Sequence, residues 1–237
     1  MQDQNHLAPV AIRAVLTGRL QPLGRKAVAS GMAKTPVSGP LRVTTLGLAG
    51  DEQGDLRVHG GPEKAVHHYP LDHYAAWRET LPSEAAHALL SAPGAFGENL
   101  STLGLTEANV CIGDRFRLGT ALVEVSQGRQ PCWKLNERFA WAGMSRAVQQ
   151  SLRTGWYYRV LEEGEVSGGD ALELAARPCP DWPLARLLHV LYVDRLNQDA
   201  LAQMAGIEPL AEGWRKLARQ RLANQAVEDM GRRLGDA

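Results

Sequence analysis

Cys132 is the residue whose type and surroundings most favour chemistry. It lies in a loop between a predicted strand and a predicted helix, with Arg129 before it and Lys134 after it. Neighbouring cations and the N-terminus of a helix both stabilise a thiolate relative to a thiol. A thiolate is a nucleophile and also a soft metal ligand, so this loop can support covalent catalysis or hold a metal.

The other two cysteines have different surroundings. Cys111 lies between two β-branched apolar residues on a predicted strand, which is typical of a small buried side chain. Cys179 lies between two prolines, as expected for a linker. Three cysteines without a C-x-x-C pair exclude a disulfide scaffold and a four-cysteine zinc or iron–sulfur site.

Two glycine-containing segments carry further candidate residues. Residues 60–64 read Gly-Gly-Pro-Glu-Lys, and Lys64 adds a cation to a backbone that a ligand can approach closely. This segment can cradle a phosphate or form an ordinary tight turn. His59 can act as a general acid or base, because the pKa of histidine lies near neutrality, or it can be a structural histidine. Asn99 in the segment 94–100 can hydrogen-bond a planar heterocycle, or the segment can simply turn the chain.

The charge balance limits the possible partners. The chain has 26 basic and 26 acidic side chains, which argues against nucleic-acid binding by bulk electrostatics. Residues 4–50 contain six basic side chains and no acidic one, which indicates either an anion site or a solvated basic face. No apolar run reaches about 18 residues and the N-terminus lacks the order of a signal peptide. We therefore expect a cytoplasmic protein that does not associate with membranes.

The elements that position these residues are mainly short strands. Glycine and proline together make up 37 of 237 residues, and strands do not alternate regularly with helices. This pattern favours a β-barrel with inserted helices over a doubly wound sheet. Gly119-Thr120 fits a two-residue hairpin turn. The predicted strands are residues 10–16, 42–46, 109–113, 115–118, 121–126, 156–161 and 171–175.

Helices are predicted within the barrel and after it. Inserted helices begin near Pro70, after a Ser83 cap, soon after Cys132 and at about residue 145. From residue 181 onward, apolar residues recur at helical spacing and predict three helices. Their eight basic and eight acidic residues argue against a DNA-reading helix-turn-helix. We expect a β-barrel domain over residues 1–180, with a core at about 40–176, and a three-helix extension over 181–237.

Several motifs follow one another in a characteristic order. They are SGMAK at 30–34, DEQGD at 51–55, VHGGPEKA at 58–65, FGENL at 96–100 and RQPCWKL at 129–135. In order and spacing they resemble the MOSC domain of the YiiM-like group, and the closing helices resemble its three-helix extension. One departure is Gln127-Gly128 before Arg129, where a proline is expected nearby.

The resemblance implies a β-barrel that binds a molybdenum cofactor, without specifying the form of the pterin. It places Cys132 as the metal ligand and implies a cofactor pocket lined by Lys34, His59, Lys64, Asn99, Arg129 and Cys132. The YiiM-like group is associated with the reduction of N-hydroxylated compounds such as 6-hydroxylaminopurine, which is a detoxification. Phe96 and Trp133 are candidate contacts for such a heterocycle.

Three functions remain open at this point. The first is a molybdenum-dependent oxidoreductase in which Cys132 and His59 are catalytic. It needs an external electron-donor protein or a soluble donor, because the sequence has no nucleotide-binding G-x-G-x-x-G and too few cysteines for an iron–sulfur cluster. The second is a non-catalytic carrier of molybdenum cofactor or sulfur. The third is a hydrolase with Cys132 as nucleophile and His59 as base.

Overall fold

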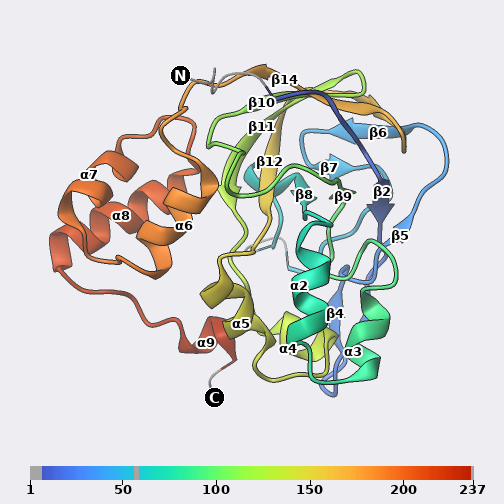
Figure 1. Ribbon diagram of the computed structural model, residues 1–237, viewed down its shortest axis with the longest axis horizontal. Helices are drawn as coiled ribbons and strands as arrows, with labels where there is room; N and C mark the ends of the chain where they lie inside the picture. Colours follow the sequence, from blue (N-terminus) through green and yellow to red (C-terminus); the bar gives the residue numbers. More distant parts are fainter. Residues whose placement is uncertain (1–6, 56–58, 236–237) are drawn as a thin grey trace.

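The computed structural model describes residues 7–55 and 59–235. The N-terminal residues used in the signal-peptide argument, and residues 56–58 of one motif, lie outside them. The described chain is mainly β with inserted helices, followed by a helical unit (Figure 1). Its strands are β1 (Val10–Ala11), β2 (Ala14–Thr17), β3 (Gln21–Leu23), β4 (Val28–Ser30), β5 (Thr35–Pro36), β6 (Leu41–Thr44), β7 (Gly47–Leu48), β8 (Val66–His68), β9 (Leu100–Ser101), β10 (Arg115–Leu118), β11 (Ala121–Gly128), β12 (Trp156–Glu162), β13 (Gly164–Val166) and β14 (Ala171–Ala176).

The main sheet is curled into a half-barrel. Within the described residues its strand order is β1-β14-β10-β11-β12-β8-β9-β2-β5, antiparallel except for β8 and β9. The predicted single strand over residues 10–16 is divided into β1, which pairs with β14, and β2, which pairs with β9. One extended segment therefore contacts distant parts of the same sheet, and this connection requires the sheet to curl.

The hairpin that leads to the Cys132 loop forms as predicted. β10 and β11 pair in register around a two-residue turn, and Gly119 has a φ of 59°. The strand predicted at residues 109–113 is wrong, because only Cys111 makes an isolated bridge there. The Asp114 carboxylate accepts a hydrogen bond from the Cys111 amide, and Gly113 has a φ of 77°. These two features turn the chain instead of extending it.

The inserted helices pack around an aromatic core of their own. They are η1 (Pro62–Lys64), α2 (His73–Thr80), α3 (Glu84–Leu89), α4 (Lys134–Arg138) and α5 (Met144–Ser151). The Ser83 cap is confirmed, because its side chain accepts a hydrogen bond from the Ala86 amide. The Phe96 ring stacks on Tyr69 with centroids 3.9 Å apart and lies 5.1 Å from Phe139 on α4's C-terminal side. This packing joins α4, which follows Cys132, to the rest of the fold.

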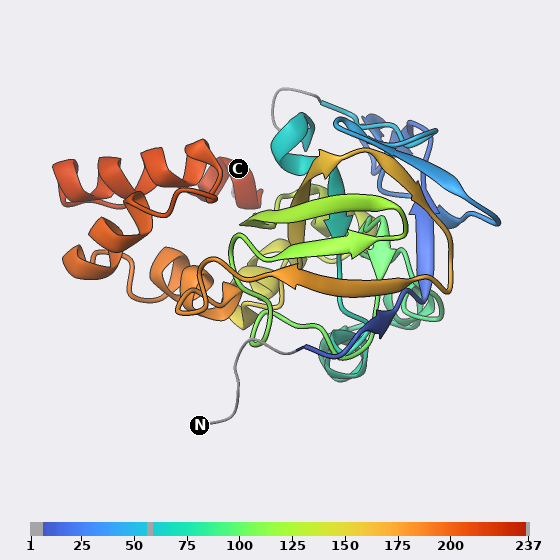
Figure 2. The same cartoon turned by 90° about the horizontal axis from the view of Figure 1, so that it is seen from above.

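The predicted helices after residue 181 are present as α6 (Leu184–Tyr192), α7 (Gln198–Ala205) and α8 (Glu212–Asn224). Asn197 caps α7 as expected, whereas α8 begins at Glu212 and not at Pro209. Apolar side chains of α6 and α8 join the same buried cluster as the interior of the sheet. Figure 2 shows these helices beside the sheet.

A further helix, α9 (Gly231–Leu234), was not predicted from the sequence. It packs next to α5, where the Ser145 hydroxyl donates to the Leu234 carbonyl (Figure 1). Four residues are too few to show helical periodicity, so the sequence carries no signal for this element.

No helix among the described residues is long and apolar enough to cross a membrane.

Candidate active site

One cleft brings together the six residues that the family resemblance implies for the cofactor pocket. Its empty volume is about 630 Å³, including its open mouth. Its walls come from the segment after β4, the segment after β7, the end of η1 and His59 before it, the segment before β9 and the loop between β11 and α4. The expected residues that line it are Lys34, His59, Lys64, Asn99, Arg129 and Cys132.

Cys132 and His59 lie next to each other in this cleft. The Cys132 Sγ is 3.6 Å from His59 Nε2, and both side chains are half-buried. Burial, and then the nearby Lys134 and Lys64 ammonium groups, lower the pKa of His59 to about 4. The imidazole is therefore neutral at pH 7 in the ligand-free protein, and one of its two ring nitrogens carries a proton.

Three cations share the cleft with Cys132 and act electrostatically on the neighbouring His59. Lys64 on η1 is within electrostatic range of Cys132, and burial lowers the pKa of its ammonium group. Arg129 is only 5% exposed, and its Nη1 has no hydrogen-bond partner among the described residues. The Lys134 Nζ donates to the Ala29 carbonyl at 3.3 Å. A buried guanidinium nitrogen without a partner is costly, so Arg129, together with two further cations in the same cleft, favours an anionic ligand.

Lys34 and Asn99 are held by an acidic residue that sequence reasoning did not single out. Asp51 forms a buried ion pair with Lys34 and accepts a hydrogen bond from the Asn99 amide at 2.9 Å. The same amide donates to the Leu16 carbonyl, and its oxygen accepts from the His67 backbone. Asn99 therefore stabilises the cleft wall with its own side chain. Asp51 is the first residue of the DEQGD motif, and this was its only signal in the sequence.

His67 is a second histidine of the cleft that the sequence did not assign to it. Its Nε2 is buried and lacks a partner among the described residues, as does His59 Nδ1. Burial, and then the Arg129 guanidinium, hold the pKa of His67 well below its usual value. Unpartnered nitrogens of His59, His67 and Arg129 therefore line one cleft. In residues 7–55 and 59–235, no group of three or more His, Cys, Asp or Glu side chains could hold a metal ion.

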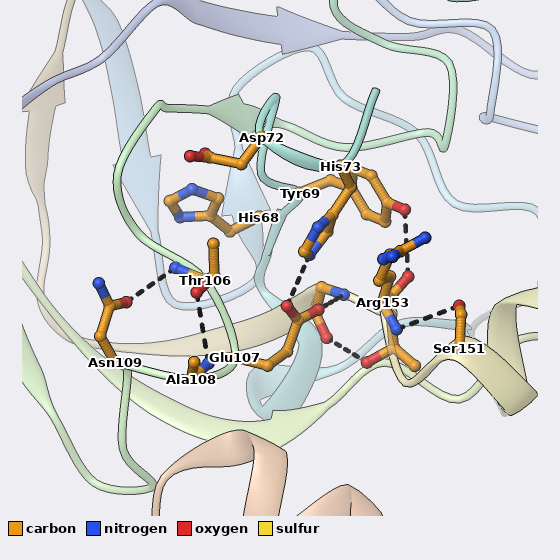
Figure 3. Close-up of polar contacts among 12 residues, drawn as sticks. His68, Tyr69, Asp72, His73, Thr106, Glu107, Ala108, Asn109, Ser151 and Arg153 are labelled. Carbon is orange, nitrogen blue, oxygen red and sulfur yellow. Dashed lines mark hydrogen bonds and ion pairs between the residues drawn. The ribbon is translucent and has the colours of Figure 1, made fainter. Parts of the chain in front are cut away.

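A buried network fixes the backbone from which Arg129 extends. Figure 3 shows His73 and Glu107 pointing toward each other, with His73 Nε2 2.6 Å from a Glu107 carboxylate oxygen. The other oxygen of Glu107 accepts from the Gly155 amide at 2.7 Å. The Gly155 carbonyl in turn accepts from the Arg129 amide at 2.9 Å. A helix on one side of the fold thereby determines the position of a residue in the cleft.

The buried histidines predict a loss of stability in mild acid. His68 donates or accepts hydrogen bonds with Tyr158 and Thr102, and burial lowers its pKa to about 3. The unfolded chain, with a pKa near 6.5, then binds the extra proton, so the free energy of unfolding falls as the pH is lowered. We expect His68 alone to contribute a loss of about 2 kcal/mol between pH 7 and pH 5.

Urea denaturation of the ligand-free protein at both pH values measures this loss. The His68→Gln variant, with its amide at the same position, should show a correspondingly weaker pH dependence. An NMR titration in which the His68 imidazole protonates near pH 6.5 in the folded protein would contradict the prediction.

The remaining aromatic and thiol candidates lie elsewhere. Phe96 touches the cleft but is 1% exposed and stacked in the aromatic core, so its ring is engaged by the protein itself. Trp133 lines a separate groove, together with Asn136 and Glu137 of α4. Burial raises the pKa of the Cys111 thiol to about 11, and burial also raises the pKa of Cys179. Of the three cysteines, Cys132 is the one in the cleft.

Comparison with family models identifies the class of protein. Residues 55–173 match the MOSC domain, and residues 182–225 match the YiiM-like, 3-alpha helix domain. The chain therefore belongs to the MOSC domain family and combines that domain with the YiiM-like helical domain.

Individual relatives agree with this assignment. Over 222 residues the chain is 40% identical to protein YiiM of Escherichia coli (strain K12), covering 93% of this chain and 96% of that one. The crystal structure of YiiM from Escherichia coli superimposes with a TM-score of 0.81 at 34% identity, covering 96% and 99% of the two chains. A Gibberella moniliformis protein named reductase is 37% identical over 90% of this chain and 38% of its own length.

Proposed function

We propose that this protein is a molybdenum cofactor-dependent reductase of N-hydroxylated compounds such as 6-hydroxylaminopurine, with the Cys132 thiolate as metal ligand. The observation that carries the proposal is the position of the Cys132 thiol in a cleft lined by buried nitrogen atoms of His59, His67 and Arg129 that have no hydrogen-bond partner within residues 7–55 and 59–235. The membership of the MOSC family and the relative named reductase support redox chemistry at this site.

The residues of the cleft fit such a cofactor. Molybdenum in a pterin cofactor prefers sulfur ligands, and Cys132 offers one soft donor. The phosphate of the pterin needs cations, and Lys64, Lys134 and Arg129 line the same cleft as Cys132, whereas Lys34 is paired with Asp51. When bound, the cofactor would supply the two-electron redox chemistry.

The protein's own residues have three tasks in this reaction. Reduction of R–NHOH to R–NH₂ consumes two electrons and two protons and releases water. His59 can donate a hydrogen bond from its protonated ring nitrogen to the departing hydroxyl group and relay a proton from solvent. Lys64 and Arg129 would bind the anionic cofactor, and the hydrogen bond between Asp51 and Asn99 would stabilise another part of the cleft wall.

Two other functions use the same residues. The 3.6 Å contact between Cys132 and His59 also fits a cysteine hydrolase. Such an enzyme needs a third group that orients the imidazole, and His59 Nδ1 has no partner among the described residues. A carrier that binds the cofactor without turnover differs from the reductase in activity alone.

The test is turnover by protein purified from a host that makes molybdenum cofactor. We expect conversion of 6-hydroxylaminopurine to adenine with reduced methyl viologen as donor, measured by chromatography, and none with NADPH alone. Sustained turnover with NADPH as the sole donor would contradict the need for an external electron-donor protein. Bound molybdenum without any turnover would indicate the carrier, and esterase activity of metal-free protein would indicate the hydrolase.

A further inference from the structure

The C-terminal segment contacts the Cys132 loop directly on both sides of the cysteine. The carbonyl of Arg233 accepts a hydrogen bond from the Trp133 amide at 2.8 Å. The Arg233 guanidinium donates through Nη1 to the Pro131 carbonyl. Backbone groups immediately before and after Cys132 are thus bound by one residue that lies about a hundred positions later in the chain.

Arg233 is itself anchored by other parts of the fold. Its Nη2 donates to the Gln149 side chain on α5 at 2.6 Å. Its guanidinium carbon lies 5.8 Å from the centre of the Tyr192 ring on α6. The next residue, Leu234, is 4% exposed, and its carbonyl accepts hydrogen bonds from Ser145 and Asn136. A short segment with this many anchors is a defined element, although it is only one turn long.

The helical domain also fixes the beginning of the loop. A Cβ placed on Gly128 would lie 3.0 Å from a Leu188 methyl carbon on α6 and 3.2 Å from the Trp214 ring on α8. The loop backbone therefore passes tightly beneath these two helices at Gly128 and is held by Arg233 at Pro131 and Trp133.

We propose that Arg233 is a positioning residue that holds the Cys132 loop in the conformation in which the thiol faces His59 and the cleft. The planar fork of its guanidinium suits this task, because separate nitrogens bind Pro131 and Gln149 at the same time. A lysine has one nitrogen at its end and cannot reproduce both contacts in that geometry. The effect on the thiol is independent of the proposed function, and the effect on cofactor retention depends on it.

The experiment compares Arg233→Ala with Arg232→Ala, which removes an adjacent and exposed arginine from the same short helix. Both are made in a Cys111→Ser, Cys179→Ser background, so that Cys132 is the single thiol. The first readout is the rate of alkylation of Cys132 by iodoacetamide in metal-free protein as a function of pH. The second is molybdenum content after expression in a cofactor-competent host, and the third is the melting temperature.

In Arg233→Ala the loop loses one charge-assisted hydrogen bond, so it should open more often and expose the Cys132 thiol to the reagent. We expect the alkylation rate at pH 7 to increase about tenfold, which corresponds to about 1.4 kcal/mol. Arg232→Ala should alkylate like the parent protein, and Arg233→Lys should show an intermediate rate. Molybdenum content should fall several-fold in Arg233→Ala alone, with a melting temperature close to that of Arg232→Ala.

Equal alkylation rates and pH profiles in Arg233→Ala, Arg232→Ala and the parent would overturn the proposal. If Arg233→Ala does not fold, the Arg233→Lys comparison decides in the same way. A changed alkylation rate in a protein that never binds molybdenum would support the positioning role and count against the proposed function, so the two failures are distinguishable.

Discussion

Replacing Cys132 by serine should remove bound molybdenum and lower reductase activity at least a hundredfold, while the melting temperature stays close to that of the parent. A serine hydroxyl is a hard donor that stays protonated at pH 7, so it cannot replace a thiolate as a ligand for a soft metal site. The cysteine is half-buried at the cleft and outside the hydrophobic clusters, so little packing is lost. Elemental analysis and turnover with reduced methyl viologen measure both effects.

The other cysteines supply matched controls. Cys111→Ser and Cys179→Ser make the same atomic change at positions outside the cleft. The Cys111 Sγ donates to the Pro180 carbonyl at 3.6 Å. Both variants should keep the molybdenum content and activity of the parent. Equal molybdenum content in Cys132→Ser and the parent would show that the thiolate is not the ligand.

Reversing the charge at Lys64 should lower cofactor retention at least tenfold. Lys64 ends a short 3-10 helix that begins after Gly61, whose φ of 90° gives the turn its shape. The Lys64→Glu variant places a carboxylate in the cleft that contains Cys132 and the proposed site of the anionic cofactor. At an effective dielectric constant of about 20, two unit charges about 4 Å apart interact by about 4 kcal/mol, so replacing attraction of a bound phosphate by repulsion is worth several kcal/mol.

A charge reversal at an exposed lysine tests whether the effect is local. Lys26 belongs to the basic N-terminal stretch and is exposed away from the cleft. Lys26→Glu should leave molybdenum content unchanged, and neither variant should lower the melting temperature by more than a few degrees. If Lys64→Glu lowers the melting temperature strongly but the folded fraction retains cofactor normally, Lys64 is a structural residue and this assignment is wrong.

Local patterns in the sequence were sufficient for several elements. The hairpin around Gly119, the Ser83 and Asn197 caps and the amphipathic helix α6 depend on neighbours within about four residues of each other, which is the range that sequence periodicity reports. The expectation of a mainly β fold, a barrel with inserted helices, likewise followed from the density of short strands and turns, and the sheet that forms is a curled half-barrel.

Non-local pairing explains where the sequence reading failed. Residues 10–16 have the composition of one strand, but the curl of the sheet divides them between β14 and β9. Residues 109–113 have β-branched neighbours, but the Asp114 side chain competes for the Cys111 amide and closes a turn. Neither outcome can be read from strand propensity, which describes how well a residue fits a sheet and not which strand it meets.

For the site, the sequence by itself determined the chemical types: one cysteine among cations, with a histidine and a lysine beside paired glycines. The tertiary structure decided that Cys132 lies 3.6 Å from His59, that Asp51 pairs with Lys34 and holds Asn99, and that Arg233 binds the loop from the far end of the chain. The physical reason is that residue type determines what a side chain can bind. Burial and long-range hydrogen bonds determine which partner it contacts in the folded protein and which protonation state is favoured there.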